Sequence, residues 1–320
     1  MTENHTFDTT EPLVTVFLAV RNNAAWLSEL LISILDGDYS NVRVVVRDDG
    51  STDGSYEILS GFAMADHRVR VLPDRTESGG AMQNFFRLMT IKGFDGDYFM
   101  FADADDIWSR DKISKTLEKM TETEAGQKDV PVLVHTDLTV VGEDRSVINP
   151  SFFAYEKLSP DRNSLKELIC QNNVTGCTVM FNRALRDLVP APPEGAVMHD
   201  WWCALIAAAF GRIAVINEPL VLYRQHGGNQ VGAYNGGSAA AAIDRLKNVE
   251  KTRSLYDAMF RQADAFADAF SDRLTPEQTR ILRRFAEIRR LGPAARRARI
   301  ITDGYWKNTL VRNLGLIAVI

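Results

Sequence analysis

The chain has 320 residues, of which 45% are hydrophobic and 25% are charged, and its formal net charge is −5. This composition is that of an ordinary globular protein, which argues against an intrinsically disordered chain. Its three cysteines, Cys170, Cys177 and Cys203, are odd in number and lack the spacing of metal ligands. We therefore expect buried thiols in a reducing compartment, with neither a disulfide framework nor a zinc site.

No segment of the sequence predicts a membrane span. The first apolar run, 13–20, follows a polar, acidic terminus and lacks the basic flank and cleavage site of a signal peptide. The apolar run at 314–320 is far shorter than the roughly 20 residues that a span needs. We expect a cytoplasmic protein, soluble or peripheral at the inner face of the plasma membrane, with no nucleic-acid partner.

Positive charge is concentrated near the C-terminus. Residues 271–320 contain 11 Lys/Arg and 4 Asp/Glu, which is +7 and leaves −12 for residues 1–270. Such a segment indicates either contact with anionic lipid or phosphate, or a solvated helix surface.

Strand and helix signals alternate through the first third of the chain. Short β-branched runs predict buried strands, and the apolar positions between them have helical spacing. This alternation predicts a mostly parallel α/β sheet, whose ligands bind beyond the carboxyl ends of the strands. The predicted elements are a strand at 13–20, a helix at 26–35, a strand at 42–47, a helix at 53–62, a strand at 69–72, a helix at 82–89, a strand at 98–101 and a helix at 113–120.

The pattern is less regular in the second half. From about Ala239 the chain reads as helices, with a break at Gly292-Pro293. We divide the chain into a flexible tail (1–12), a sheet-containing domain (13–237) and a helical C-terminal region (238–320). The other predicted elements are a strand at 132–141, helices at 165–169 and 202–210, and short strands at 213–216 and 220–223.

Two acidic turns follow predicted strands. Asp103, Asp105 and Asp106 come directly after the strand at 98–101. Their charges repel one another unless a cation binds, and Mg²⁺ or Mn²⁺ held together with substrate phosphate oxygens would satisfy them. The alternative is a solvated acidic turn that caps the next helix. The second turn, 48–53, can accept hydrogen bonds from a ribose or base, or can serve only as a helix cap.

The order and spacing of these motifs resemble the family 2 glycosyltransferases, which have the GT-A fold. The resemblance covers roughly residues 13–232 and includes Val20-Arg21-Asn22-Asn23, the Asp-Asp-Gly-Ser-Thr-Asp turn and the Asp-x-Asp motif. It implies a nucleotide-sugar half at 13–110 and an acceptor half at 111–237, with Asp49 on the base and Asp105 on the metal. The donor-side residues that it implies are Ala19, Val20, Arg21, Asp49, Asp103 and Ala104. Gly80 is the last residue of a glycine-containing segment that precedes the helix with Asn84. This segment either brings backbone N–H groups to the donor or forms only a turn.

The segment Met198-His199-Asp200-Trp201-Trp202 opens a predicted helix. By position in the family pattern, Asp200 resembles the catalytic base, and a sugar hydroxyl needs such a group to take its proton as it attacks. One base and one metal predict direct displacement with inversion. The alternative is an N-cap pair, and many family members have two adjacent acids where this chain has His-Asp. Residues 173–178 resemble the acceptor-side strand of the family, which implies Thr175 and Gly176 on the acceptor side, although core packing explains this segment about as well. We expect His199 and Trp201 on the acceptor side too.

The loop Tyr223-Arg224-Gln225-His226 follows a predicted strand. In the family a histidine in such a loop often completes the metal site, which implies that role for His226, with Arg224 as a phosphate clamp. A lone loop histidine is more often a surface group.

Together the motifs most resemble bacterial rhamnosyltransferases of surface polysaccharide assembly. The resemblance implies transfer of L-rhamnose from dTDP-rhamnose to a glycan or lipid-linked acceptor, and UDP-galactose, UDP-glucose and UDP-N-acetylglucosamine remain open as donors. A nucleotidyltransferase and a non-catalytic binding module are the alternatives. This chain lacks the basic glycine-rich loop that we would expect in a nucleotidyltransferase, and its intact acidic residues argue against a non-catalytic module. We also expect the basic C-terminal segment to dock on the membrane, with Trp306, Leu310, Val311, Leu314 and Ile317.

Overall fold

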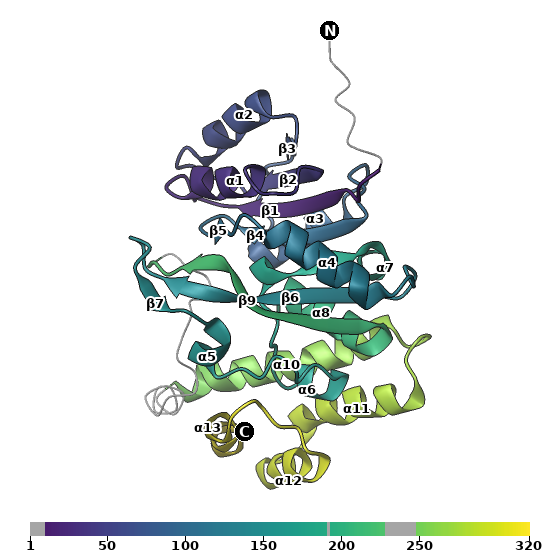
Figure 1. The fold of residues 1–320 in the computed structure, drawn as a ribbon. Coiled ribbons are helices and arrows are strands. Elements are labelled where there is room, and N and C mark those ends of the chain that lie inside the picture. The colour runs from purple at the N-terminus through teal and green to yellow at the C-terminus, as the bar shows by residue number, and fades with distance from the viewer. Residues whose placement is uncertain (1–9, 191–192, 228–247) are drawn as a thin grey trace.

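The computed structural model of the chain describes residues 10–190, 193–227 and 248–320. Most of the predicted tail, the predicted boundary at residue 237 and the predicted helix start near Ala239 lie outside these residues. In the described part, a central sheet with helices on both faces is followed by a group of C-terminal helices (Figure 1).

Nine strands form one mixed sheet in the described structure. They are β1 (Val14–Val20), β2 (Val42–Asp48), β3 (Val69–Val71), β4 (Tyr98–Asp103), β5 (Ile107–Trp108), β6 (Val132–Val141), β7 (Val147–Asn149), β8 (Met180–Asn182) and β9 (Arg212–Arg224). Their order is β3-β2-β1-β4-β8-β6-β9-β5, with β7 paired to β6. The strands from β3 to β4 are parallel, β8 is antiparallel to both of its neighbours, and β6 and β9 are parallel. β5 is antiparallel to β9, and β7 is antiparallel to β6. The predicted α/β sheet is confirmed, and its parallel part runs from β3 to β4 and includes the β6–β9 pair.

Helices follow most of the strands. They are α1 (Leu27–Leu35), α2 (Ser55–Ala65), α3 (Ala81–Thr90), α4 (Lys112–Glu124), α5 (Phe152–Glu156), α6 (Leu165–Leu168), α7 (Arg183–Arg186), α8 (His199–Phe210), α10 (Val249–Ala269), α11 (Pro276–Ala286), α12 (Pro293–Asp303) and α13 (Leu310–Val319), with short 3₁₀ turns η1 (Gly176–Thr178) and η2 (Glu287–Arg290). The helices predicted from apolar spacing are therefore present, with ends that differ by a few residues.

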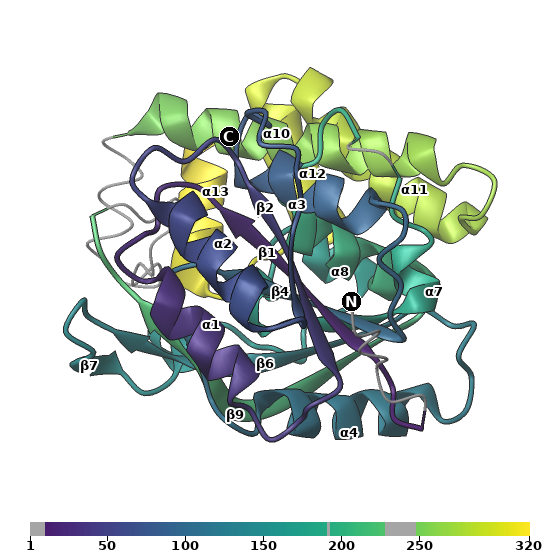
Figure 2. The ribbon, with the colours of Figure 1, turned by 90° about the horizontal axis from the view of Figure 1, so that it is seen from above.

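Alternate residues of the central strands face two separate hydrophobic layers. In β1, Val16 and Leu18 pack on the side of α1, α2 and α4, whereas Phe17 faces the layer that contains α3 and α8. In β4, Phe99 and Phe101 belong to this second layer too. Figure 2 shows the two groups of helices on opposite faces of the sheet. The sheet is thus buried on both faces, and its polar groups emerge at the strand ends.

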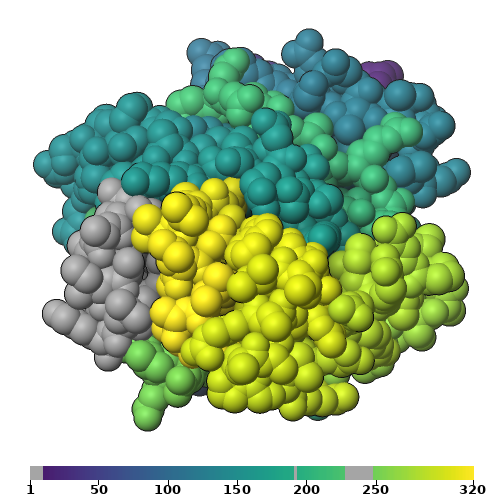
Figure 3. Space-filling model, turned by 90° about the horizontal axis from the view of Figure 1, so that it is seen from below, coloured from purple at the N-terminus to yellow at the C-terminus, as the bar shows by residue number. Residues whose placement is uncertain are grey.

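The C-terminal helices share the second layer. Trp202 of α8 lies 5.2 Å from Phe266 of α10, and Phe260 of α10 lies 4.9 Å from Phe285 of α11, measured between ring centroids. Seen from below, the yellow C-terminal segment packs directly against the teal part of the chain (Figure 3). These helices therefore belong to the same hydrophobic core as the sheet.

The prediction of two short strands at 213–216 and 220–223 is wrong, because β9 is one continuous strand. Pro219 lies between the two predicted segments and cannot donate a ladder hydrogen bond. The strand passes this point through an irregularity, with register shifts against β6 around Asp137. The strand therefore accommodates the proline by a local change of register and continues to Arg224.

The cysteines agree with the prediction of buried thiols. All three cysteines are buried free thiols. Among the described residues, no helix combines the length and the apolar content that crossing a membrane requires.

Candidate active site

A large pocket lies beyond the carboxyl ends of β1, β2 and β4, and we call it the main pocket. Its volume is about 1140 Å³. Every residue predicted for the site lines it except Arg224. These residues are Ala19, Val20, Arg21, Asp49, Gly80, Asn84, Asp103, Ala104, Asp105, Thr175, Gly176, His199, Asp200, Trp201 and His226. The sequence motifs therefore converge on one cavity, where the parallel sheet topology places ligands.

Asp49 connects the turn after β2 to the loop that precedes α3. Its carboxylate accepts hydrogen bonds from the Ser78 N–H at 2.6 Å and from Arg47 Nη1 at 2.8 Å. The buried Arg47 also donates to the Asn84 side chain at 3.0 Å and to the carboxylate of Asp74. The expected donor-side residues Asp49 and Asn84 are thus held in one rigid network that borders the main pocket.

The ends of β1 and β2 are tied to each other. Asn22 has a left-handed backbone (φ 54°), its N–H donates to Ser51 Oγ at 2.9 Å, and its side chain accepts from the Thr52 N–H at 2.9 Å. Asn residues adopt this conformation more readily than most others. The loop that carries Arg21 is therefore fixed against the acidic turn of β2.

Asp105 and His226 meet at the mouth of the main pocket. Nε2 of His226 lies 2.8 Å from Oδ2 of Asp105, and the imidazole ring lies 5.9 Å from the Trp26 ring. Their sequence separation is 121 residues, so the fold has to bring them together. A carboxylate oxygen and an imidazole nitrogen in contact form a ligand pair that suits a divalent cation such as Mn²⁺.

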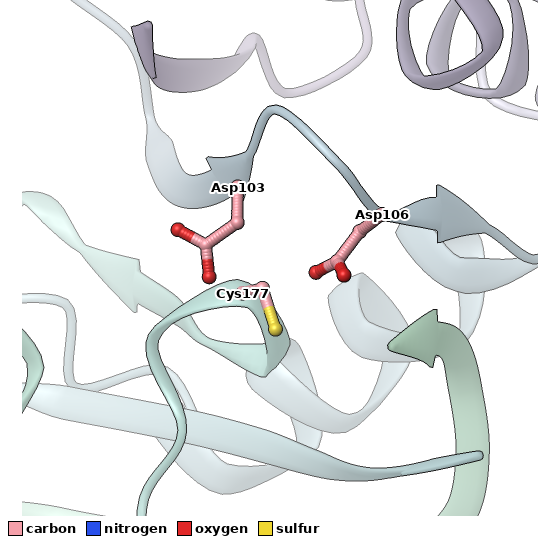
Figure 4. A group of neighbouring side chains, drawn as sticks. All are labelled: Asp103, Asp106 and Cys177. Carbon is pink, nitrogen blue, oxygen red and sulfur yellow. The ribbon is translucent and has the colours of Figure 1, made fainter. Parts of the chain in front are cut away.

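Of the other two acids of the motif, Asp106 is fully buried and Asp103 is half-buried. Burial, together with the charges of Asp105 and Asp200, raises the pKa of Asp103 to about 7. Burial and the charge of Asp103 raise the pKa of Asp106 well above its ordinary value. Asp103 and Asp106 both point toward Cys177 of η1, and one ligand atom of each of the three lies within 4.8 Å of the others (Figure 4).

The burial of these carboxyl groups bears on the predicted cation. A carboxylate that is desolvated beside other carboxylates gains most when a cation binds. The thiol of Cys177 lies beside Asp103 and Asp106, and its own pKa is raised well above the ordinary value by burial and by these two acids. It is therefore a neutral hydrogen-bonding group, and the oxygens of the motif together with His226 fit Mg²⁺ or Mn²⁺ better than a thiolate-based site does.

Asp200 lies in the first turn of α8 with its side chain in the main pocket. The N-cap of α8 is Met198, so Asp200 is not the cap. Its carboxylate accepts a hydrogen bond from the Trp201 N–H at 2.6 Å and another from the backbone of Gly176. Burial raises the pKa of Asp200 to about 6. A carboxylate with a pKa near neutrality, facing a cavity, can accept a proton.

His199 is a packing residue beside Asp200. Its ring stacks on Phe85 with centroids 4.0 Å apart and meets the edge of Phe101 at 4.7 Å. Burial lowers the pKa of His199 to about 3, so the imidazole is neutral. A Cβ added to Gly176 would lie 3.0 Å from His199 Nε2, which explains why η1 begins with glycine. Asp200 is therefore the one acid at this position, and His199 fixes the start of α8.

The expectation for Arg224 is corrected by its position. Its side chain is 2% exposed, and it is not among the described residues that line the main pocket. The guanidinium donates to Oε2 of Glu29 at 2.5 Å and to the carbonyl oxygens of Asp105 and Glu143, and it lies over the Trp26 ring. These contacts engage the guanidinium group that the sequence analysis expected to bind phosphate. Arg224 instead holds the backbone of the Asp-x-Asp turn.

Several lining residues escaped the sequence analysis. Arg312 of α13 and Leu255 of α10 come from the C-terminal region, and Glu156 of α5 bonds to Arg312 at 2.7 Å. Nothing in the sequence pairs residues 156 positions apart, so no signal could have found this contact. Trp26 and Asn173 also line the main pocket, and neither was assigned a role in the site from the sequence.

Comparison with known proteins decides the family. Residues 15–189, just over half of the chain, match the family described as glycosyl transferase family 2. The chain belongs to this family. A relative in Shigella flexneri, the dTDP-rhamnosyl transferase RfbG, is 27% identical over 229 residues, which cover 68% of this chain and 74% of that protein. The chain is therefore a glycosyltransferase that resembles bacterial rhamnosyltransferases.

Comparison with solved structures gives the fold. TarS of S. aureus (residues 1–349, in complex with UDP-GlcNAc) superposes with a TM-score of 0.54 at 16% identity, over 95% of this chain and 90% of that one. The mannosyltransferase PcManGT from Pyrobaculum calidifontis, in complex with GDP-Man and Mn²⁺, has a TM-score of 0.51 at 18% identity, over 97% and 80% of the two chains. The fold of this glycosyltransferase is GT-A, as predicted.

Proposed function

We propose that the chain is an inverting, metal-dependent glycosyltransferase that moves L-rhamnose from dTDP-rhamnose to a glycan or lipid-linked acceptor. The observation that carries the proposal is the convergence of Asp49, the Asp105–His226 pair and Asp200 on one pocket of about 1140 Å³. These are the groups needed to bind a base, hold a diphosphate through a cation, and accept a proton.

The donor side of the main pocket is assigned to the nucleotide. Asp49 accepts hydrogen bonds from the base, Ala19, Val20 and Arg21 lie along the nucleoside, and Asp103 and Ala104 lie beside the ribose and diphosphate. Helix α3 begins directly after Gly80. The φ of Gly80 is 129°, a value that glycine adopts readily, and it lets the backbone turn toward the main pocket. Asn84 positions the turn through Arg47.

The metal would be held by Asp105 and His226. When bound, Mg²⁺ or Mn²⁺ supplies positive charge that stabilises the diphosphate leaving group. His226 keeps one ring nitrogen directed at Asp105, and Trp26 packs on its ring. Because Arg224 is bonded to Glu29, we assign Asp105 and His226, and not Arg224, to the diphosphate end of the site.

Asp200 is assigned as the catalytic base. Its pKa of about 6 leaves it ionised at neutral pH and still basic enough to take the proton of an attacking hydroxyl. The backbone bonds from Trp201 and Gly176 orient the carboxylate. Thr175, Gly176 and Trp201 form the wall on which the acceptor rests. A single base opposite the leaving group predicts inversion at the anomeric carbon.

The identity of the donor rests on the relative in Shigella flexneri, which is named a dTDP-rhamnosyl transferase. UDP-galactose, UDP-glucose and UDP-N-acetylglucosamine are the alternatives, and the TarS complex with UDP-GlcNAc supports the last. A panel of nucleotide sugars tested for thermal stabilisation with Mn²⁺ distinguishes them. We expect the largest shift with dTDP-rhamnose, and a larger shift with a UDP-sugar would replace the rhamnosyl assignment.

The sequence left a nucleotidyltransferase open, because that class also uses carboxylate-held metal, and the family match argues against it. The two activities release different products: a glycosyltransferase releases a nucleoside diphosphate, whereas a nucleotidyltransferase releases pyrophosphate. We expect nucleoside diphosphate alone, and pyrophosphate release from a nucleoside triphosphate would contradict the proposal.

We also propose that the C-terminal region docks peripherally at the inner face of the plasma membrane. Leu310 and Leu314 of α13 are 73% and 59% exposed. Trp306 is instead partly buried against the core, and several arginines of the segment are ion-paired, among them Arg284 with Asp303. Docking would therefore depend on the exposed leucines more than on Trp306.

A further inference from the structure

A smaller pocket lies beside the main pocket, toward the C-terminal helices, and we call it the side pocket. Its volume is about 290 Å³. Trp201, the neighbour of Asp200, is part of the wall that the two pockets share. The residues common to both linings are Gln171, Asn172, Trp201, Leu255 and Arg312. A ligand that has one group at Asp200 can therefore extend past Trp201 into the side pocket.

The two pockets differ in charge. The described lining of the main pocket contains six carboxylates, whereas that of the side pocket contains none and includes Lys307 and Arg312. Arg312 lies in both linings and is paired with Glu156 of the main pocket at 2.7 Å. The contrast in charge between the two pockets therefore depends on Lys307.

The walls of the side pocket are rigid and suit a sugar. The Trp201 ring is fixed by a hydrogen bond from Nε1 to the Leu168 carbonyl at 2.7 Å, and Lys307 Nζ lies 4.5 Å from the centroid of the buried Tyr256 ring. Gln171 is held by the Asn308 N–H, which donates to its Oε1 at 3.0 Å. Aromatic rings offer apolar faces to sugar rings, and amides bond to hydroxyl groups.

We propose that the side pocket binds an anionic group of the acceptor, a phosphate or a carboxylate attached to the sugar whose hydroxyl is activated at Asp200. Lys307 faces this group, and Trp201 forms part of the wall that the two pockets share. The inference rests on the proposed function, because it places the acceptor on the Asp200 side of the main pocket. It makes the C-terminal helices a determinant of acceptor choice.

Three small probes test the charge preference directly. Glucose 1-phosphate, glucuronic acid and the neutral methyl glucoside are titrated into the full chain, and binding is followed by ligand-detected NMR. We expect one anionic probe to bind about tenfold more tightly than methyl glucoside, because hydrogen bonds to charged groups are the strong ones, and to weaken as salt is added. The better anionic probe identifies phosphate or carboxylate as the group. Equal affinity for all three probes would overturn the inference.

Lys307→Met removes the charge and keeps an apolar chain beside Tyr256. The matched control is Lys166→Met, which removes a lysine that lies 5.9 Å from the Tyr305 ring and is absent from both described linings. We expect about a tenfold loss of anionic-probe affinity in Lys307→Met and wild-type affinity in Lys166→Met. Wild-type affinity in a folded Lys307→Met would contradict the assignment.

A second pair of variants keeps the test decisive if Lys307→Met fails to fold. Leu255 is 49% exposed at the rim of both pockets, so Leu255→Trp obstructs the side pocket without disturbing the core. Leu314→Trp, at a 59% exposed position outside both described linings, is the control. We expect loss of anionic-probe binding in the first variant and no change in the second. Unchanged binding in Leu255→Trp would count against the side pocket.

Failure of this inference is separable from failure of the proposed function. Release of nucleoside diphosphate from the donor sugar with Mn²⁺ tests the donor site without any acceptor. A chain that releases nucleotide but binds the three probes equally keeps its proposed function and loses the acceptor subsite. If the chain binds an anionic probe through Lys307 but releases no nucleotide from any donor, the anion site stands and the proposed function is contradicted.

Discussion

At the residue scale, Asp200 carries the most specific chemical assignment. Asp200→Asn keeps the shape of the side chain and removes the basic oxygen. We expect donor binding within about twofold of wild type and a fall in kcat of roughly 10²–10⁴, the range that a general base contributes. Calorimetry for binding and a nucleotide-release assay for turnover check the two parts. Normal turnover in this variant would remove Asp200 from the mechanism.

The pKa of Asp200 gives a pH dependence with a definite sign. A base must be ionised to act, and burial raises the pKa of Asp200 to about 6. We expect kcat/KM to be level above pH 7 and to fall below pH 6, approaching tenfold per pH unit. Nucleotide affinity measured at the same pH values separates this effect from protonation of the metal-site acids. A flat rate profile between pH 5 and 8 is the contrary result.

Residue roles were readable from the sequence only where a motif fixed them. The motif order pointed to Asp49, Asp105, Asp200 and His226, and all four line one pocket. Arg224 was misassigned because its partner Glu29 lies 195 residues away in the chain, a contact that no local pattern encodes.

At the element scale, the hydrophobic period predicted where helices and strands lie, because each element buries one face. The exception is β9, where the bulge around Pro219 is decided by pairing with β6 and not by local propensity. The sequence separated the C-terminal helices from the sheet as a region of its own. In the structure, aromatic residues of α8 and α10 form one cluster, as in the contact of Trp202 with Phe266.

This shared cluster predicts that α10 is needed for the stability of the whole domain. Phe266 is fully buried and contacts Trp202, Phe210 and Phe270. We expect Phe266→Ala to lower the free energy of unfolding by about 3–5 kcal/mol, the usual cost of such a cavity. Urea denaturation should show one transition. The exposed Leu310→Ala is the control, with a change of about 0.5 kcal/mol or less. A second, separate transition would show that the helices fold independently.

At the scale of the whole molecule, the fold class followed from the alternation of strands and helices, and the pocket followed from the sheet topology. The extent of the main pocket could not be predicted from the sequence, because part of its wall combines α5 and α13 through the contact of Glu156 with Arg312. Such contacts depend on the packing of the complete chain.

The exposed surface of α13 allows the membrane proposal to be tested. Leu310→Gln/Leu314→Gln removes two exposed apolar side chains without touching the core. We expect wild type to sediment with liposomes that contain anionic lipid, and the double variant to be recovered mostly in the supernatant. Ile32→Gln/Met64→Gln, at exposed positions of α1 and α2, is the matched control. Equal sedimentation of wild type and the α13 double variant would dispose of leucine-dependent docking.

The central claim is that Asp105 and His226, which come from separate turns, bind a nucleoside diphosphate through one divalent cation. The most direct measurement is calorimetric titration of dTDP into the chain with and without Mn²⁺, repeated for Asp105→Asn. We predict that Mn²⁺ strengthens dTDP binding in the wild type at least tenfold, and that Asp105→Asn abolishes this gain. Full-strength, Mn²⁺-dependent binding in Asp105→Asn would contradict the assignment of Asp105 to the metal.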